Sequence, residues 1–171
     1  MWHDSRKTNK TLDKTQPPKK LKPHFENITI LSYRFRFLNT EQFQILLHHK
    51  HKERIRTWLN KLTKDKYLKR YYRKKLDEEP AAFSLGTMGR KYFLARPEIP
   101  DINTTILDRV WRESKYTKTF KNHCLFLVHV YISLLKFVKG AGLKEENLKF
   151  FTNADLQGVQ HLLEQKPDAY F

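Results

Sequence analysis

Two neighbouring stretches decide the fold of this chain: Lys52-Glu-Arg-Ile-Arg-Thr-Trp-Leu-Asn-Lys-Leu-Thr-Lys64 and Tyr67-Leu-Lys-Arg-Tyr-Tyr-Arg73. In the first, Ile55, Leu59 and Leu62 recur at helical spacing and form one apolar stripe. A step of about 100° per residue places Arg54, Thr57, Asn60, Lys61 and Lys64 on the opposite side, with Arg56 beside them. The second stretch is rich in aromatic residues, which favour strands. We therefore predict a helix over 52–65 and a strand over 67–73.

The flanking sequence supplies the remaining elements of a winged helix. Residues 27–38 repeat apolar side chains at helical spacing, and Asn39-Thr40 offers an N-cap for a second, shorter helix that stops near His48-His49. Downstream, the polar turn 74–80 leads to a second strand over 81–85, and a fourth helix is expected over 90–95. The order of three helices, a hairpin and a helix is typical of a winged helix-turn-helix domain.

The predicted fold class is mainly α with a small β-hairpin, a winged helix-turn-helix domain followed by a partial α/β domain. The predicted domains are a disordered basic arm (1–25), the winged helix (26–96), a linker (97–107) and an α-rich start of a second domain (108–171). In this last part we expect a long, buried apolar helix within 108–139, a candidate strand at 148–152 and a helix over 155–164. The sequence stops at the start of a further strand, 167–171, so we interpret the second domain as truncated.

The positive charge is concentrated in one part of the chain. The 34 Lys and Arg residues outnumber 18 Asp and Glu, for a net charge of +16. Residues 50–75 alone hold twelve basic and two acidic residues, a net charge of +10. A solvated surface is the usual explanation of a charge run, but this one coincides with the third helix and the wing. It therefore indicates a polyanionic partner.

The predicted partner is double-stranded DNA, with the third helix in the major groove and the wing on phosphates. The predicted contacts before and within the helix are Lys50, Lys52, Arg54, Arg56, Thr57, Asn60, Lys61 and Lys64, and those in the wing are Lys69, Arg70, Arg73, Lys74 and Lys75. The basic arm would follow the backbone or the minor groove. RNA is disfavoured because no RNA-reading signature is present.

Several runs of the sequence resemble the bacterial replication-relaxation family, winged-helix proteins of plasmids and conjugative elements. They are Ile30-Leu-Ser-Tyr-Arg-Phe-Arg-Phe-Leu-Asn-Thr-Glu-Gln-Phe43, Arg54-Ile-Arg-Thr-Trp-Leu-Asn-Lys-Leu62, Ala82-Phe-Ser-Leu-Gly-Thr-Met-Gly89, His123-Cys-Leu-Phe-Leu-Val-His-Val-Tyr131 and Lys166-Pro-Asp-Ala-Tyr-Phe171. The resemblance implies a role in plasmid replication or conjugative DNA mobilisation, with replication or transfer proteins as further partners. The alternatives are a transcriptional regulator of a mobile element and a protein-interaction adaptor. A dimer is one of the oligomeric states left open.

The sequence disfavours catalysis, metal binding and membrane insertion. Asp168 would suit a metal-dependent nuclease, but no later sequence supplies the second carboxylate that such a site needs. His48, His49 and His51 lack the ligand spacing of a zinc site and are interpreted as surface histidines. We expect no enzyme activity and no cofactor. The apolar stretch 124–138 is short of the roughly 20 residues of a membrane span, and one cysteine, Cys124, fits a reducing, cytoplasmic location.

Overall fold

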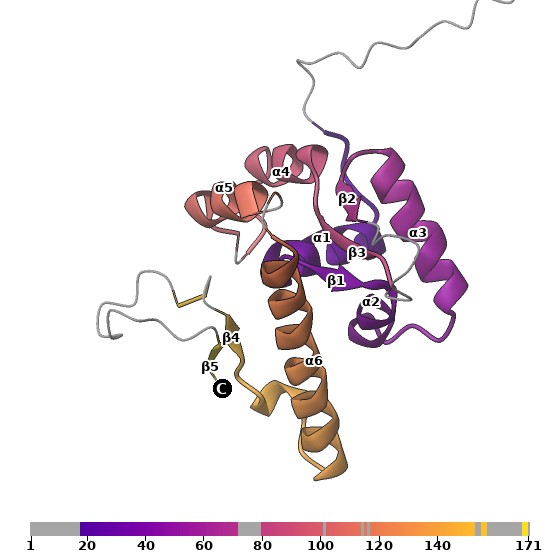
Figure 1. Ribbon diagram of the computed structural model, residues 1–171, viewed down its shortest axis with the longest axis vertical. Helices are drawn as coiled ribbons and strands as arrows, with labels where there is room; N and C mark the ends of the chain where they lie inside the picture. The colour runs from indigo at the N-terminus through magenta and orange to yellow at the C-terminus, as the bar shows by residue number, and fades with distance from the viewer. Residues whose placement is uncertain are drawn as a thin grey trace, which may run out of the picture.

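The computed structural model describes residues 18–71, 80–100, 102–113, 115, 117–152, 155–156 and 169–170. Its elements are α1 (Pro23–Phe35), β1 (Leu38–Asn39), α2 (Thr40–Leu46), α3 (Lys52–Lys64), β2 (Leu68–Tyr71), β3 (Ala82–Leu85), α4 (Thr87–Leu94), α5 (Thr104–Glu113), α6 (Lys118–Gly140), the 3-10 helix η1 (Glu145–Asn147), β4 (Phe151–Thr152) and β5 (Ala169–Tyr170). Helices surround a small sheet, and α6 runs along one side of it (Figure 1). The fold is mainly α with a small β component, as predicted.

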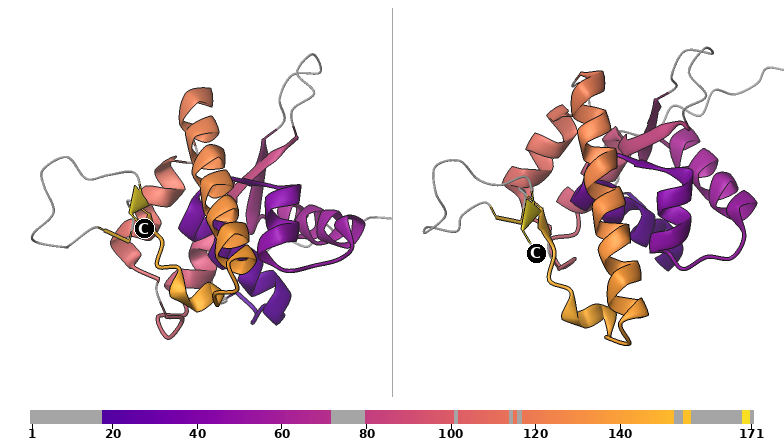
Figure 2. Two further views of the ribbon diagram at one scale, coloured as in Figure 1. Left: turned by 90° about the horizontal axis from the view of Figure 1, so that it is seen from below. Right: turned by 60° about the horizontal axis from the view of Figure 1, so that its bottom comes forward.

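The small sheet has the strand order of a winged helix. β3 lies in the middle, antiparallel to both neighbours, with Leu38 of β1 opposite Phe83 and Leu68 of β2 opposite Leu85. β2 and β3 are the wing strands, and Figure 2 shows them projecting beside α3. Helix α1, strand β1, helices α2 and α3 and then the two wing strands follow one another in the chain. This succession establishes a winged helix-turn-helix domain.

One apolar core joins the three helices to the sheet. Ile28 of α1, Phe43 of α2, Ile55 and Leu59 of α3 and Phe83 of β3 are buried in the same cluster. Full burial of one such side chain stabilises the fold by about 1.5–3 kcal/mol. The core therefore fixes the orientation of α3, with the apolar stripe inward and the polar side in solvent.

The bounds of α1 differ from the prediction at both ends. The helix begins at Pro23, inside the predicted basic arm, because proline suits the first position of a helix, where its missing N–H costs nothing. It ends at Phe35, since Arg36 adopts a positive φ of 67°. Leu38 and Asn39 then form β1, a strand that the sequence did not predict, and Asn39 caps α2 in a capping box with Gln42. Residues 1–17 of the predicted arm lie outside the described residues.

The second half of the chain packs directly on the winged helix. α5 begins at Thr104, within the stretch predicted as a linker. Val128 and Ile132 of α6 belong to the same core cluster as α1, α2 and α3. The Gln42 side chain donates a hydrogen bond to the backbone oxygen of Leu125, at 2.8 Å. β4 and β5 pair as an antiparallel two-stranded sheet, within the two predicted strands. Residues 157–164 of the predicted helix lie outside the described part of the chain.

Only one face of α6 is buried, although a buried helix was predicted. Cys124, Val128, Ile132 and Val138 are covered, whereas Phe126 is 61% exposed and Phe137 72% exposed. His129, on the same helix, is also exposed. By length and composition alone, α6 is the one helix in the described residues that could cross a membrane. Its packing on α1, α2 and β1 is compatible with a soluble protein.

Two ion pairs hold α5 against the rest of the domain. Glu113, only 1% exposed, forms an ion pair with Arg36, whose Nε lies 2.8 Å from Glu113 Oε2, and its Oε1 accepts a hydrogen bond from Arg109 Nε of the same helix at 2.7 Å. Arg90 of α4 donates its Nε to Asp108 at 2.7 Å, in a more exposed position. The two pairs fix α5 beside α4 and beside the turn that follows α1.

Glycine at position 86 permits a close approach between the turn after α3 and the start of α4. A Cβ at this position would lie 2.4 Å from the backbone oxygen of Lys66. The Gly86 N–H donates to the Tyr67 oxygen at 2.7 Å, and the Met88 N–H donates to the Lys66 oxygen at 2.9 Å. Lys66 itself has a positive φ of 61°, which ends α3. The end of α3, the start of β2 and the start of α4 therefore meet in one compact turn.

Candidate nucleic-acid interface

The long side chains of α3 face solvent, as the sequence predicted. The predicted contacts that lie exposed before and within the helix are Lys50, Lys52, Arg54, Arg56, Thr57, Asn60, Lys61 and Lys64. Ile55, Leu59 and Leu62 are buried on the opposite side. Trp58 at the edge is half-buried, stacked on His24 at 4.4 Å between ring centroids. The helix thus presents a polar surface on a rigid support.

Two acidic side chains pair with cations of this surface. Glu53 lies 2.7 Å from Arg56 Nη1, and Asp65 lies 3.5 Å from Lys61 Nζ. All four side chains are exposed, and exposed pairs of this kind contribute about 0–1 kcal/mol. A phosphate can therefore replace either carboxylate at little cost, so the pairs do not block an anionic partner.

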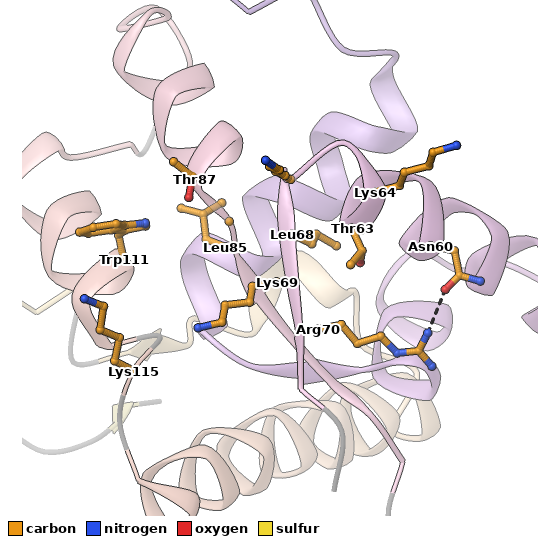
Figure 3. Close-up of a pocket in the computed structure, with 12 residues that line it drawn as sticks. Asn60, Thr63, Lys64, Leu68, Lys69, Arg70, Leu85, Thr87, Trp111 and Lys115 are labelled. Atoms are coloured by element: carbon orange, nitrogen blue, oxygen red, sulfur yellow. Dashed lines mark hydrogen bonds between the residues drawn. The ribbon is translucent and has the colours of Figure 1, made fainter. Parts of the chain in front are cut away.

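The wing is tied to α3 through Arg70. Its Nη1 donates to Asn60 Oδ1 at 3.1 Å (Figure 3), and its guanidinium lies 5.5 Å from the centroid of Phe83. Lys69, on the other side of β2, is exposed. The predicted wing contacts Arg73, Lys74 and Lys75 lie outside the described residues. The structure thus brings Asn60 and Arg70, ten residues apart in sequence, together at one surface.

A groove of about 350 Å³ separates the start of α2 from α3 and the wing. Lys52, Arg56, Asn60 and Arg70 line it, and these are predicted contacts. Thr40, Glu41 and the wing residues Pro80, Ala81 and Phe83 also line it and were not predicted. The predicted N-cap at Asn39-Thr40 was the available signal that the start of α2 would contribute to the surface.

A second, larger hollow of about 790 Å³ lies between β2 and α5. Lys69 points toward Trp111 and Lys115, and Leu85 and Thr87 also line the hollow (Figure 3). The proximity of Trp111 and Lys115 to the wing could not be predicted from the sequence, because it depends on the packing of α5 on α4.

The histidines before α3 and the cysteine of α6 make contacts within the fold. His49 Nδ1 accepts a hydrogen bond from the backbone N–H of His51 at 3.1 Å, and His48 lies 3.6 Å from Glu145. Within the described residues, no group of three or more His, Cys, Asp or Glu side chains could hold a metal ion. Cys124 is buried.

Two tyrosines of the predicted strand 67–73, Tyr67 and Tyr71, can either stack on bases or pack within the fold. Tyr67 packs against Tyr92 with ring centroids 6.1 Å apart, and Tyr71 against Phe37 at 5.5 Å. These contacts support packing for both tyrosines. Tyr72 and Asp168 lie outside the described residues.

The fold and this surface define a winged helix-turn-helix protein with a basic third helix. No protein-family model matches the chain, and a search of curated proteins finds no match. Among solved structures, the chain is similar to that of the E41A mutant of ZitR from Lactococcus lactis, with 17% identity over 74% of this chain and 80% of that one and a TM-score of 0.40. The fold assignment rests on the order and pairing of the elements described above.

Proposed function

We propose that this chain binds duplex DNA, with α3 in the major groove and the wing on the flanking backbone. The observation that carries the proposal is the shared surface of α3 and the wing. Asn60 and Arg70 meet there, and the exposed cations of α3 surround them. Asparagine suits the adenine edge, and arginine and lysine suit phosphates and guanine, so this surface offers both sequence readout and affinity.

The proposal extends to plasmid replication or conjugative DNA mobilisation. Its support is the resemblance of residues 30–43, 54–62 and 82–89 to replication-relaxation proteins. A transcriptional regulator would use the same surface on a promoter. The neighbouring genes separate these roles, since relaxase or coupling-protein genes favour mobilisation. Enrichment of random duplexes on the purified protein would supply the target sequence and locate it relative to an origin or a promoter.

The salt dependence of duplex binding tests the interface itself. If six to eight cations contact phosphates, a plot of log affinity against log salt should have a slope of about −5 to −7. Replacing Lys64 by Gln should weaken binding and make the slope less steep by about 1. Lys139→Gln, an exposed position at the far end of α6, is the matched control and should leave both values unchanged. An affinity that does not change with salt would contradict the proposal.

The exposed side of α6 favours a second function, that of a protein-interaction adaptor. Phe126 and Phe137 lie on this side and are largely in solvent. Replacing both by Asp should leave duplex affinity unchanged but abolish activity in the host if a protein partner docks there. The adaptor function would be contradicted if the variant with Asp at positions 126 and 137 is fully active in the host while charge reversal at Arg54 and Lys61 abolishes that activity.

A further inference from the structure

The hollow between β2 and α5 has the composition of an anion site. Its cations are Lys64, Lys66, Lys69, Arg70 and Lys115, and none of the twelve described residues that line it is acidic. Among the described residues, no carboxylate lies within ion-pair distance of the four lysines. The four lysines, which have no carboxylate partner among the described residues, repel one another, so a bound anion would relieve that repulsion.

The hollow also offers an aromatic surface and apolar contacts. Trp111 is half-buried, and the nitrogen end of its indole points into the hollow, toward Leu85 (Figure 3). Lys115 Nζ lies 5.6 Å from the Trp111 ring centroid, a contact that a flexible lysine can exchange for another ligand. Leu68 and Leu85 are buried at the base. A ligand that satisfies this site combines a negative group with a flat ring.

Hydrogen-bonding groups face the same space from the side of α4. Thr87, the first residue of α4, is exposed and lines the hollow together with Gly86. The N–H groups of Gly86 and Met88 already donate to backbone oxygens, so this side offers a ligand the Thr87 hydroxyl. The volume of about 790 Å³ lies within the range of roughly 300–1,000 Å³ that is usual for small-molecule sites.

We propose that the hollow between β2 and α5 binds a free mononucleotide, with its base against Trp111 and its phosphate between Lys69, Lys115 and the start of α4. Three residues of the DNA surface, Asn60, Lys64 and Arg70, line the same hollow. A nucleotide bound there therefore competes with the duplex for positive charge and weakens DNA binding. This consequence, though not the nucleotide site itself, rests on the proposed function.

Isothermal titration calorimetry of the full chain without DNA tests the site. The probes are AMP, adenosine (which lacks the phosphate) and inorganic phosphate (which lacks the ring). AMP should bind saturably, and each of the other two should bind at least about tenfold more weakly. Trp111→Leu should weaken AMP binding about tenfold, and Lys115→Gln about threefold to tenfold. Lys115 is exposed, so its variant folds normally, and Lys139→Gln again serves as the matched control.

Duplex affinity measured on the same preparations completes the experiment. AMP should raise the duplex Kd of the wild-type chain, and Lys115→Gln should need a higher AMP concentration for the same effect. Absence of AMP binding, or equal AMP affinities in Lys115→Gln and Lys139→Gln, would overturn the nucleotide site. If AMP does not bind and Trp111→Leu lowers the duplex affinity, the nucleotide site is also overturned. In that case α5 belongs to the DNA contact. Because AMP binding is measured without DNA, failure of this site and failure of DNA binding are separate results.

Discussion

Replacing Glu113 by Gln should destabilise the domain more than any other change of a single charge among its described ion pairs. Glu113 is 1% exposed and is held between Arg36 Nε at 2.8 Å and Arg109 Nε at 2.7 Å. The Arg36 side chain is 11% exposed, so the variant leaves a nearly buried guanidinium opposite a neutral amide.

The expected loss follows from the burial of the two arginines. Removal of one partner of a buried ion pair costs about 3–5 kcal/mol, because the remaining charge stays out of water without compensation. The Arg109 side chain is 43% exposed and can turn to solvent, which places the loss toward the lower end of that range. We expect the free energy of unfolding to fall by about 3 kcal/mol.

Asp108→Asn provides a matched control for this variant. It makes the same chemical change on the same helix, but the Asp108 side chain is 49% exposed and its partner Arg90 31% exposed. Pairs this exposed contribute about 0–1 kcal/mol. Urea unfolding followed by circular dichroism measures both losses, and the slope with urea should be unchanged. Equal losses in the two variants would refute the argument from burial.

Three further predictions concern the stability of the same fold. Gly86→Ala should lower the free energy of unfolding by about 1–3 kcal/mol, because its Cβ would lie 2.4 Å from the Lys66 backbone oxygen. Gly140 has open space around it, so Gly140→Ala should leave the melting temperature unchanged or raise it slightly. Leu59→Ala should cost about 2–5 kcal/mol in urea unfolding, and a loss below 1 kcal/mol would contradict the assigned core. Burial, together with a hydrogen bond to Glu26, raises the pKa of Tyr92 to about 12, so its stabilising contribution is complete below pH 10 and is lost as the pH rises through 12. The stability of Tyr92→Phe should not show this decline. If the stabilities of the wild-type and variant proteins fall in parallel between pH 10 and 12, Tyr92 does not cause the decline.

The elements that the sequence predicted well are those whose signal is local and repeated. Ile55, Leu59 and Leu62 define the buried stripe of α3 by spacing alone, and the observed helix ends within one residue of the prediction. β1 was missed because it has two residues, Leu38 and Asn39, and exists only through its pairing with β3. Propensity over so short a segment cannot outweigh the helical pattern that precedes it.

The candidate site likewise has one part that the sequence predicted and another that it did not. The outward face of α3 follows from its periodicity, so the exposure of Arg54, Asn60 and Lys64 was predictable. The approach of Trp111 and Lys115 to the wing was not, since it depends on α5 packing against α4 through Arg90 and Asp108. Contacts between elements far apart in sequence have no periodic signature.

The turn at Lys66 and Tyr67 has a mechanical consequence for α3. Backbone hydrogen bonds join this turn to Leu62 of α3 and to Gly86 and Met88 at the start of α4, so the joint resists bending. A displacement of α4 large enough to overcome the packing of α3 on the core would turn α3 about this joint. Thirteen residues span about 20 Å, so a tilt of roughly 10° at the joint moves the far end by roughly 3 Å. That shift equals the length of a hydrogen bond, which makes the contacts of Lys52 and Arg56 the ones most sensitive to whatever occupies the space beside α4.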